Sequence, residues 1–217
     1  MKYVDYERPT NLKAALEILQ NNGETTKILA GGTDMLVKLR IRREQPDLLL
    51  DSKEIPELNE LFYNQDSGLT VGGAVPLYKL YNHEDVRKYY KCIVDATTII
   101  GGIPVQGRAT LGGNLCNAAP SGDSIPALIV LGATASIHTL NDSREVSINE
   151  FCTGPGSTIL KNNEMVVSIN IPSPKQNSGA HYMRFTPRNE MDIAVVGVGT
   201  SVELSDDGST FKDVQVA

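Results

Sequence analysis

Apolar residues near the N-terminus recur at helical spacing and then fall in short runs. Leucines on one face predict a helix over residues 10–23, with Thr10 as its N-cap and Gly23 just past its end. Residues 27–40 predict a short strand, a glycine turn and a second helix that begins near Thr33. The chain therefore opens with alternating helices and strands.

The next segment continues the same mixture. Short apolar runs bounded by turn residues predict buried strands at residues 46–52 and 68–75. Residues 77–100 have a broadly helical pattern, and the β-branched stretch "ATTII" near its end favours an early stop. Helices are therefore expected to dominate up to about the middle of the chain.

Beyond Gly132 the pattern changes to one typical of strands. Residues 134–140 and 144–151 predict two strands around a turn, and residues 164–171 predict a third. Residues 194–208 predict a long fourth strand with alternating apolar positions. The fold class expected is α+β, with a mostly antiparallel sheet in the second half.

A break in the pattern separates the two parts of the chain. Proline and charged residues interrupt it at residues 52–58. We therefore expect a small N-terminal α/β lobe, residues 1–55, and a larger α+β lobe, residues 56–217.

Composition and charge exclude several classes of partner. The formal net charge of −6 is spread over the 217 residues, which argues against nucleic acid. The N-terminus lacks an apolar leader, and the longest apolar segment, residues 125–137, is too short to span a bilayer, so a soluble cytoplasmic protein with no membrane contact is expected. The 3 cysteines lie far apart without metal-ligand spacing, so any iron–sulfur cluster or zinc is expected on another chain.

Two glycine pairs are the candidate chemistry. Gly31 and Gly32 follow a predicted strand and precede a helix, so backbone N–H groups could approach an anion such as a diphosphate without an intervening Cβ. Gly112 and Gly113 allow a second close approach. Neither loop matches the Rossmann or P-loop pattern, and both pairs could instead be ordinary tight turns.

Four ordered motifs carry a family resemblance. The stretches "ILAGGTDMLVKL", "TLGGNLCNAAPSGDSIPALIVLGA", "EMVVSINIP" and "YMRFTPRNEMDIAVV" resemble the FAD-binding subunits of molybdenum hydroxylases, the xanthine dehydrogenase and carbon monoxide dehydrogenase family. The resemblance implies a flavin-binding fold of the p-cresol methylhydroxylase type and FAD as the cofactor. Members of the family continue for a further C-terminal part, so the chain is expected to be truncated.

The resemblance also implies which residues bind FAD. It places the first loop and the glycines of the second at the diphosphate, Asp123 at ribityl or ribose hydroxyls, Ile100 and Gly101 at backbone contacts, and Val166 at the adenine end. Asp192 and Ile193 fall on a strand that passes the isoalloxazine ring, and Arg184 stands where many members have lysine. The full predicted set is Ile28, Leu29, Ala30, Gly31, Gly32, Thr33, Asp34, Met35, Ile100, Gly101, Thr110, Gly112, Gly113, Asn114, Asp123, Val166, Arg184, Asp192 and Ile193.

Two of these positions have simpler readings. Asp123 could cap the helix that follows it, because aspartate is a favoured N-cap. Asp192 could form a surface ion pair with Arg188, four residues before it. Arg184 keeps the positive charge of the family's lysine but cannot change its charge at ordinary pH.

The resemblance implies an electron-transfer function. A molybdenum-cofactor large subunit would hydroxylate the substrate, [2Fe-2S] clusters on a small subunit would relay electrons, and FAD on this chain would pass them to NAD or another acceptor. We expect no catalytic side chain and no metal ligand here. "FCTGPGS" and "RNEMDIA" favour a xanthine dehydrogenase-type complex, with carbon monoxide or other aromatic or aldehyde dehydrogenases as alternatives. A stand-alone FAD-dependent oxidoreductase and a non-catalytic assembly module remain open.

Overall fold

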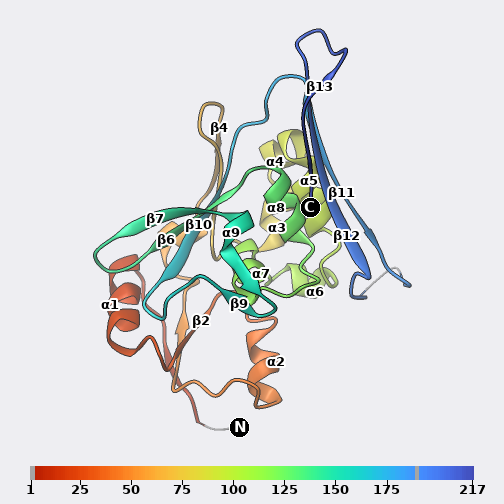
Figure 1. The fold of residues 1–217 in the computed structure, drawn as a ribbon. Coiled ribbons are helices and arrows are strands. Elements are labelled where there is room, and N and C mark those ends of the chain that lie inside the picture. The colour runs from red at the N-terminus through yellow and green to blue at the C-terminus, as the bar shows by residue number, and fades with distance from the viewer. Residues whose placement is uncertain (1–2, 189–190) are drawn as a thin grey trace.

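The N-terminal part forms a small parallel sheet with helices beside it. The structure is a computed structural model that describes residues 3–188 and 191–217. Strands β1 (Asp5–Glu7), β2 (Thr26–Leu29) and β3 (Leu48–Asp51) pair in parallel in the order β1-β3-β2. Helix α1 (Leu12–Asn22) precedes β2 and α2 (Met35–Arg40) follows it (Figure 1). The all-leucine start of β3 is buried, as its apolar run predicts.

Helix α1 begins one residue later than expected. The prediction of Thr10 as N-cap was wrong, because the Asn11 side chain accepts the Ala14 N–H at 2.9 Å. Gly23 does lie just past the helix end. The buried face of α1 packs with Leu50 of β3 and with Val167, so the N-terminal part shares a core with the rest of the chain.

The second sheet is antiparallel and has five strands. Its order is β4 (Leu61–Asn64), β5 (Gly68–Gly72), β10 (Met165–Ile171), β6 (Thr134–His138) and β7 (Ser143–Ser147). The strand predicted through residue 151 was wrong at its end: α9 (Ile148–Phe151) follows β7, and it buries Ile148 and Phe151. A two-stranded ribbon, β8 (Cys152–Gly154) with β9 (Ser157–Thr158), follows α9.

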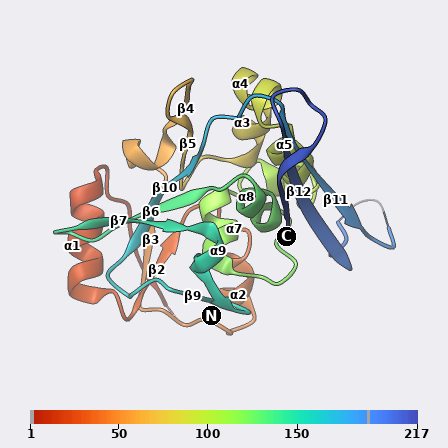
Figure 2. The same cartoon turned by 45° about the horizontal axis from the view of Figure 1, so that its top comes forward.

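Short helices fill the space beside this sheet. Instead of one long helix, residues 77–100 form α3 (Leu77–Asn82), α4 (Glu84–Tyr89) and α5 (Lys91–Thr97), and the early stop expected near "ATTII" is confirmed. The remaining elements are η1 (Pro56–Asn59), α6 (Ile103–Gln106), α7 (Leu111–Asn117) and α8 (Ser124–Val130). Figure 2 shows α7 and α8 between the five-stranded sheet and the C-terminal strands.

The C-terminal strands form a third sheet with one covered and one open face. Its order is β11 (Ser178–Phe185), β12 (Val196–Leu204) and β13 (Phe211–Val216), all antiparallel. Gly199 of β12 faces α8, where an added Cβ would lie 2.7 Å from the Pro126 carbonyl oxygen. The alternating valines therefore point away from the helices. The exposed apolar side chains on these strands are Met183, Phe185, Val196, Val198, Phe211, Val214 and Val216.

None of the described helices has the length and apolar character that a bilayer crossing requires. The longest, α1, has 11 residues.

An ion pair between a buried carboxylate and an exposed arginine joins β7 to the loop before β10. Arg144 Nε and Nη2 donate to the two carboxylate oxygens of Glu164 at 3.1 and 2.9 Å, and the Lys161 N–H donates to Oε2 at 2.8 Å. Burial alone would raise the pKa of Glu164, but these hydrogen bonds outweigh it and hold the pKa below its ordinary value.

Replacing this carboxylate with an amide is expected to destabilise the fold in a pH-dependent way. Glu164→Gln should lower the free energy of unfolding by about 1–3 kcal/mol near pH 7, because a buried partner of Arg144 is lost. A lowered pKa stabilises the fold above the unfolded value and that contribution is lost as pH falls, so the difference from wild type should shrink below about pH 4. Urea unfolding across pH measures it, and a difference that stays constant across pH would contradict the assignment.

Candidate functional site

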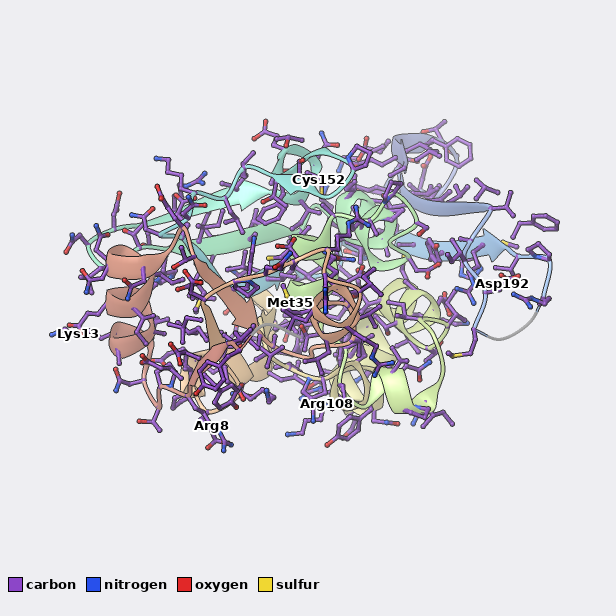
Figure 3. The ribbon with its side chains drawn as sticks, turned by 90° about the horizontal axis from the view of Figure 1, so that it is seen from below. Arg8, Lys13, Met35, Arg108, Cys152 and Asp192 are labelled. Carbon is purple, nitrogen blue, oxygen red and sulfur yellow. The ribbon has the colours of Figure 1, made fainter. Side chains whose placement is uncertain are left out.

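A cavity of about 760 Å³ lies where the N-terminal sheet meets α7 and the C-terminal strands. This size is typical of a site for a small molecule or cofactor. Figure 3 shows Met35, one of its lining residues, near the middle of the molecule, with Lys13 and Asp192 toward opposite ends. Both glycine loops reach the cavity wall, so segments distant in the sequence meet there.

The first glycine loop connects β2 to α2. An added Cβ on Gly31 would lie 2.2 Å from the Arg108 carbonyl oxygen, so Gly31 allows close contact between two backbone segments. Gly32 has a φ of +81°, a conformation that side chains with a Cβ disfavour. The two glycines therefore have different structural requirements.

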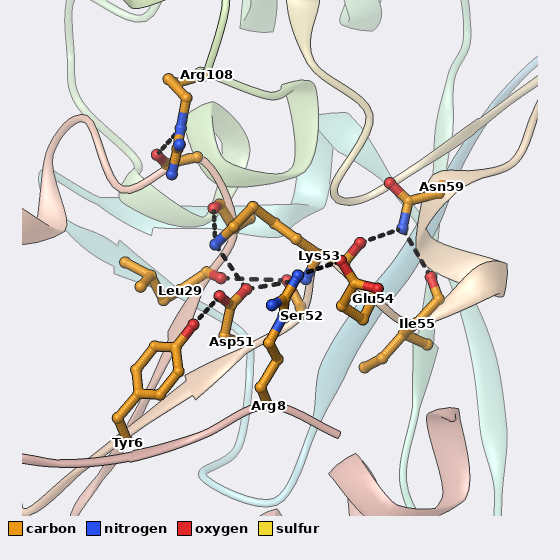
Figure 4. A network of polar contacts seen from close by, with 12 residues as sticks. Tyr6, Arg8, Leu29, Asp51, Ser52, Lys53, Glu54, Ile55, Asn59 and Arg108 are labelled. Carbon is orange, nitrogen blue, oxygen red and sulfur yellow. Dashed lines mark hydrogen bonds and ion pairs between the residues drawn. The ribbon is translucent and has the colours of Figure 1, made fainter. Parts of the chain in front are cut away.

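Three side chains donate hydrogen bonds to the carbonyl groups of this loop. Ser52 Oγ and Lys53 Nζ donate to the carbonyls of Leu29 and Ala30, both at 3.4 Å, and Arg108 Nε donates to the Gly31 carbonyl at 3.4 Å (Figure 4). Lys53 also donates to Asp51 at 2.6 Å, and that carboxylate accepts the Tyr6 hydroxyl.

The N–H groups of the same loop are left without protein acceptors. Within residues 3–188 and 191–217, no group accepts a hydrogen bond from the N–H of Gly31, Gly32 or Thr33. Adjacent backbone N–H groups with no acceptor form a concavity suited to an anion. The turn-only alternative leaves these donors unexplained.

The second glycine loop begins α7. Thr110 is its N-cap, and the Thr110 hydroxyl accepts the Gly113 N–H at 2.9 Å. An added Cβ on Gly112 would lie 2.6 Å from the Gly73 carbonyl oxygen, whereas one on Gly113 would meet, of the described residues, only the Thr110 hydroxyl, at 3.0 Å. Gly113 therefore leaves space open on the cavity side. Asn114 is partly engaged already, since its Oδ1 accepts the Ser124 hydroxyl at 2.6 Å.

Asp123 is held by two side chains of β11. Its Oδ1 accepts the Tyr182 hydroxyl at 2.8 Å and its Oδ2 accepts Arg184 Nη1 at 3.2 Å. Asp123 occupies the N-cap position of α8, as the helix-cap alternative predicts, but its carboxylate accepts no backbone N–H at the start of that helix and so forms no side-chain cap. Burial raises the pKa of Asp123, and the hydrogen bond from Tyr182 and the charge of Arg184 oppose that rise.

The residues expected near the flavin ring lie in a loop and not in a strand. Asp192 and Ile193 precede β12, which begins at Val196. The predicted surface pair is present, with Arg188 Nη2 at 3.3 Å from Asp192 Oδ1, and hydrogen bonds from Arg188 lower the pKa of Asp192.

Every residue of the predicted set except Leu29 lines the cavity. Leu29 is buried in β2 and contributes its carbonyl to the contacts behind the loop. The lining residues from the set are Ile28, Ala30, Gly31, Gly32, Thr33, Asp34, Met35, Ile100, Gly101, Thr110, Gly112, Gly113, Asn114, Asp123, Val166, Arg184, Asp192 and Ile193.

The sequence did not predict the residues that hold other site residues in place by hydrogen bonds. Tyr182 and Lys53 do not line the cavity, yet they bind Asp123 and the first loop. Lys38 of α2 also donates to the Asn117 side chain of α7 at 2.7 Å, which ties the two glycine-loop helices together. Only the position of Tyr182, two residues before Arg184, gave a signal, since alternate residues of a strand share a face.

Comparisons with known proteins find relatives over almost the whole chain. Residues 2–174 match the model of the FAD binding domain in molybdopterin dehydrogenase. The chain is 30% identical over 216 residues to the xanthine dehydrogenase FAD-binding subunit of Escherichia coli O157:H7, which covers 99% of this chain and 73% of that protein. It is 26% identical over 212 residues to the nicotinate dehydrogenase FAD-subunit of Eubacterium barkeri, with 96% and 71% covered.

A solved structure shows the same fold. The structure of a carbon monoxide dehydrogenase from Hydrogenophaga pseudoflava superposes with a TM-score of 0.93 at 26% identity, covering 99% of this chain and 73% of the matched chain. The predicted α+β flavin-binding fold and the prediction of FAD as cofactor are confirmed. This chain belongs to the family of FAD-binding domains of molybdopterin dehydrogenases.

Proposed function

We propose that this chain is the FAD-binding subunit of a multi-subunit molybdenum hydroxylase in the cytoplasm. It takes electrons from [2Fe-2S] clusters on a small partner subunit and passes them through FAD to NAD or another acceptor, while a large subunit carries the molybdenum cofactor and binds the substrate. The observation that carries the proposal is that Gly31, Gly32 and Thr33, whose N–H groups have no acceptor among the described residues, line a cavity with the second glycine loop and Asp123 in its wall.

The residues present fit an FAD molecule. The open N–H groups suit a diphosphate, and the space beside Gly113 admits it without a Cβ. Asp123 can accept hydrogen bonds from ribityl or ribose hydroxyls, because a carboxylate has about four lone-pair sites and the protein uses only part of them. The remaining assignments follow the resemblance: Val166 at the adenine, and Ile100, Gly101, Asp192 and Ile193 along the rest of the cofactor.

The chemistry divides between cofactor and protein. FAD supplies the redox chemistry, and the protein supplies binding, orientation and electrostatics. Arg184 contributes a positive charge at the cavity wall, but its pairing with Asp123 offsets part of that charge. No side chain is needed as a general base, which agrees with a subunit that transfers electrons and leaves bond-making to a partner.

The relatives support a subunit over a stand-alone enzyme. They are named as an FAD-binding subunit, an FAD-subunit and, for Hydrogenophaga pseudoflava carbon monoxide dehydrogenase, a medium chain. Identity is 30% to the xanthine dehydrogenase subunit, 32% to a caffeine dehydrogenase subunit beta and 27% to the carbon monoxide dehydrogenase chain, so the preference for a xanthine dehydrogenase-type complex rests on the sequence motifs alone.

Purification of the tagged protein from its native cells tests the proposal. Expected are flavin, molybdenum, and iron with acid-labile sulfide in fixed ratio to the tagged chain, and anaerobic bleaching of the flavin band by NADH if NAD is the acceptor. A flavin-loaded chain that elutes alone and turns over a small molecule unaided would favour a stand-alone oxidoreductase. A colourless chain with no metal would contradict both.

A further inference from the structure

Tyr182 reaches the flavin site from the covered face of the third sheet. The residue is 3% exposed and lies on β11, paired with Gly199 of β12. An added Cβ on Gly197, also in β12, would lie 2.2 Å from the Tyr182 hydroxyl oxygen. The absence of a side chain at Gly197 therefore creates the space that this hydroxyl occupies.

The two contacts on Asp123 fix its orientation. Each carboxylate oxygen accepts from one side chain of β11, Oδ1 from Tyr182 and Oδ2 from Arg184. Rotation of the carboxylate about its Cβ–Cγ bond would disturb both hydrogen bonds. Asp123 and Arg184 line the cavity, whereas Tyr182 lies behind them.

We propose that Tyr182 is a positioning residue of the flavin site. From the space that Gly197 leaves, its hydroxyl holds Asp123 so that the remaining lone pairs of the carboxylate face the hydroxyl groups of the cofactor's ribityl chain or ribose. This inference rests on the proposed binding of FAD in the cavity, and it adds a residue that touches the cofactor only through Asp123.

The same hydrogen bond acts on the protonation of Asp123. Burial raises the pKa of this carboxyl, while Tyr182 and Arg184, both on β11, oppose the rise. They are the titratable side chains with the largest effects on Asp123, and Cys92 of α5 acts in turn on Tyr182. Loss of the hydroxyl removes one opposing effect, so the pKa of Asp123 should rise further. A protonated Asp123 loses acceptor capacity, and FAD affinity should then fall at a higher pH than in the wild type.

Titration of the cofactor-free chain with FAD across pH tests the inference. Tyr182→Phe keeps the ring and removes the hydroxyl, and it should raise the Kd for FAD about tenfold, the effect expected for one hydrogen bond to a charged group. It should also move the acid-side loss of affinity to higher pH. Gly197→Ala, which displaces the hydroxyl, should change both quantities in the same direction.

A second buried tyrosine gives the matched control. Tyr90 is 1% exposed, and its hydroxyl donates to the Pro172 carbonyl at 3.1 Å, away from the cavity. Tyr90→Phe should lower stability without changing the Kd or its pH profile. In an Asp123→Asn background, where position 123 no longer titrates, Tyr182→Phe should cause no pH shift.

The outcomes separate this inference from the proposed function. Wild-type protein that binds no FAD would overturn the proposed function itself. Wild-type protein that binds FAD, with a folded Tyr182→Phe variant of unchanged Kd and unchanged pH profile, would overturn only the role of Tyr182. A loss of affinity without a pH shift, matched by an unexpected loss of the same size in Tyr90→Phe, would assign Tyr182 to packing alone and would also overturn the inference.

Discussion

Replacement of Gly113 with valine is expected to abolish FAD binding while the chain stays folded. Within the described part of the chain, an added Cβ there meets only the Thr110 hydroxyl, at 3.0 Å, so the branched side chain would extend into the cavity. The cost to the fold should be limited to the cap of α7, about 1 kcal/mol. Flavin fluorescence titration measures the affinity, and urea unfolding of the cofactor-free protein measures the stability.

A glycine-to-valine change outside the cavity is the control that separates filling of the cavity from a general effect of adding a valine. Among the residues that the structure describes, none has an atom within 4 Å of a Cβ added to Gly179 of β11, which does not line the cavity. Gly179→Val should therefore bind FAD like the wild type. Full FAD binding by Gly113→Val would show that the cofactor does not approach this loop.

Replacement of Gly112 with valine is expected to destabilise the chain whether or not FAD is present. Its added Cβ would lie 2.6 Å from the carbonyl oxygen and 2.8 Å from the Cα of Gly73, and backbone cannot move aside as a flexible side chain can. We expect the free energy of unfolding to fall by about 3 kcal/mol or more, the upper end for an overpacked core. Urea unfolding of the cofactor-free protein measures the loss.

The first loop offers an independent repeat of this contrast. Gly31→Val should destabilise the apoprotein in the same way, since its added Cβ would lie 2.2 Å from the Arg108 carbonyl oxygen. Stable, well-folded Gly112→Val or Gly31→Val apoprotein would contradict the close backbone contacts on which this prediction depends.

The sequence predicted both glycine loops but not that the two glycines of each loop have different structural roles. In each pair the first glycine meets backbone from a distant segment, Arg108 or Gly73, whereas the second has either a positive φ or open space beside it. Contacts between segments far apart in the chain leave no local pattern. The structural role of Gly31 and Gly112 therefore became visible only in the fold.

The role of Asp123 shows a similar limit. Its place before an apolar helix left an N-cap open as an alternative, and only the family resemblance pointed to a role in cofactor binding. The partners Tyr182 and Arg184 lie about sixty residues away in sequence, on strand β11 of the third sheet. The local sequence would let the Asp123 carboxylate cap α8, whereas the fold pairs it with two distant side chains. The distant pair prevails because a buried carboxylate needs charged or hydrogen-bonding partners.

The period of apolar residues predicted where the strands lie but not which of their faces is buried. The alternating valines of β12 were correctly read as a strand, but the face packed on α8 carries Gly199 and the valine face is exposed. Where a sheet packs closely on a helix, only small residues such as glycine fit between them. A pattern of hydrophobic positions does not mark such a face as buried. The division into lobes at residue 55 stays a prediction.

Titration of the cofactor-free wild-type chain with FAD and, separately, with FMN tests the central claim most directly. The claim is that a dinucleotide spans the two glycine loops of one cavity. It predicts saturation at one FAD per chain and much weaker binding of FMN, which lacks the second phosphate and the adenosine. Failure to bind FAD, or FMN binding as tight as that of FAD, would contradict it.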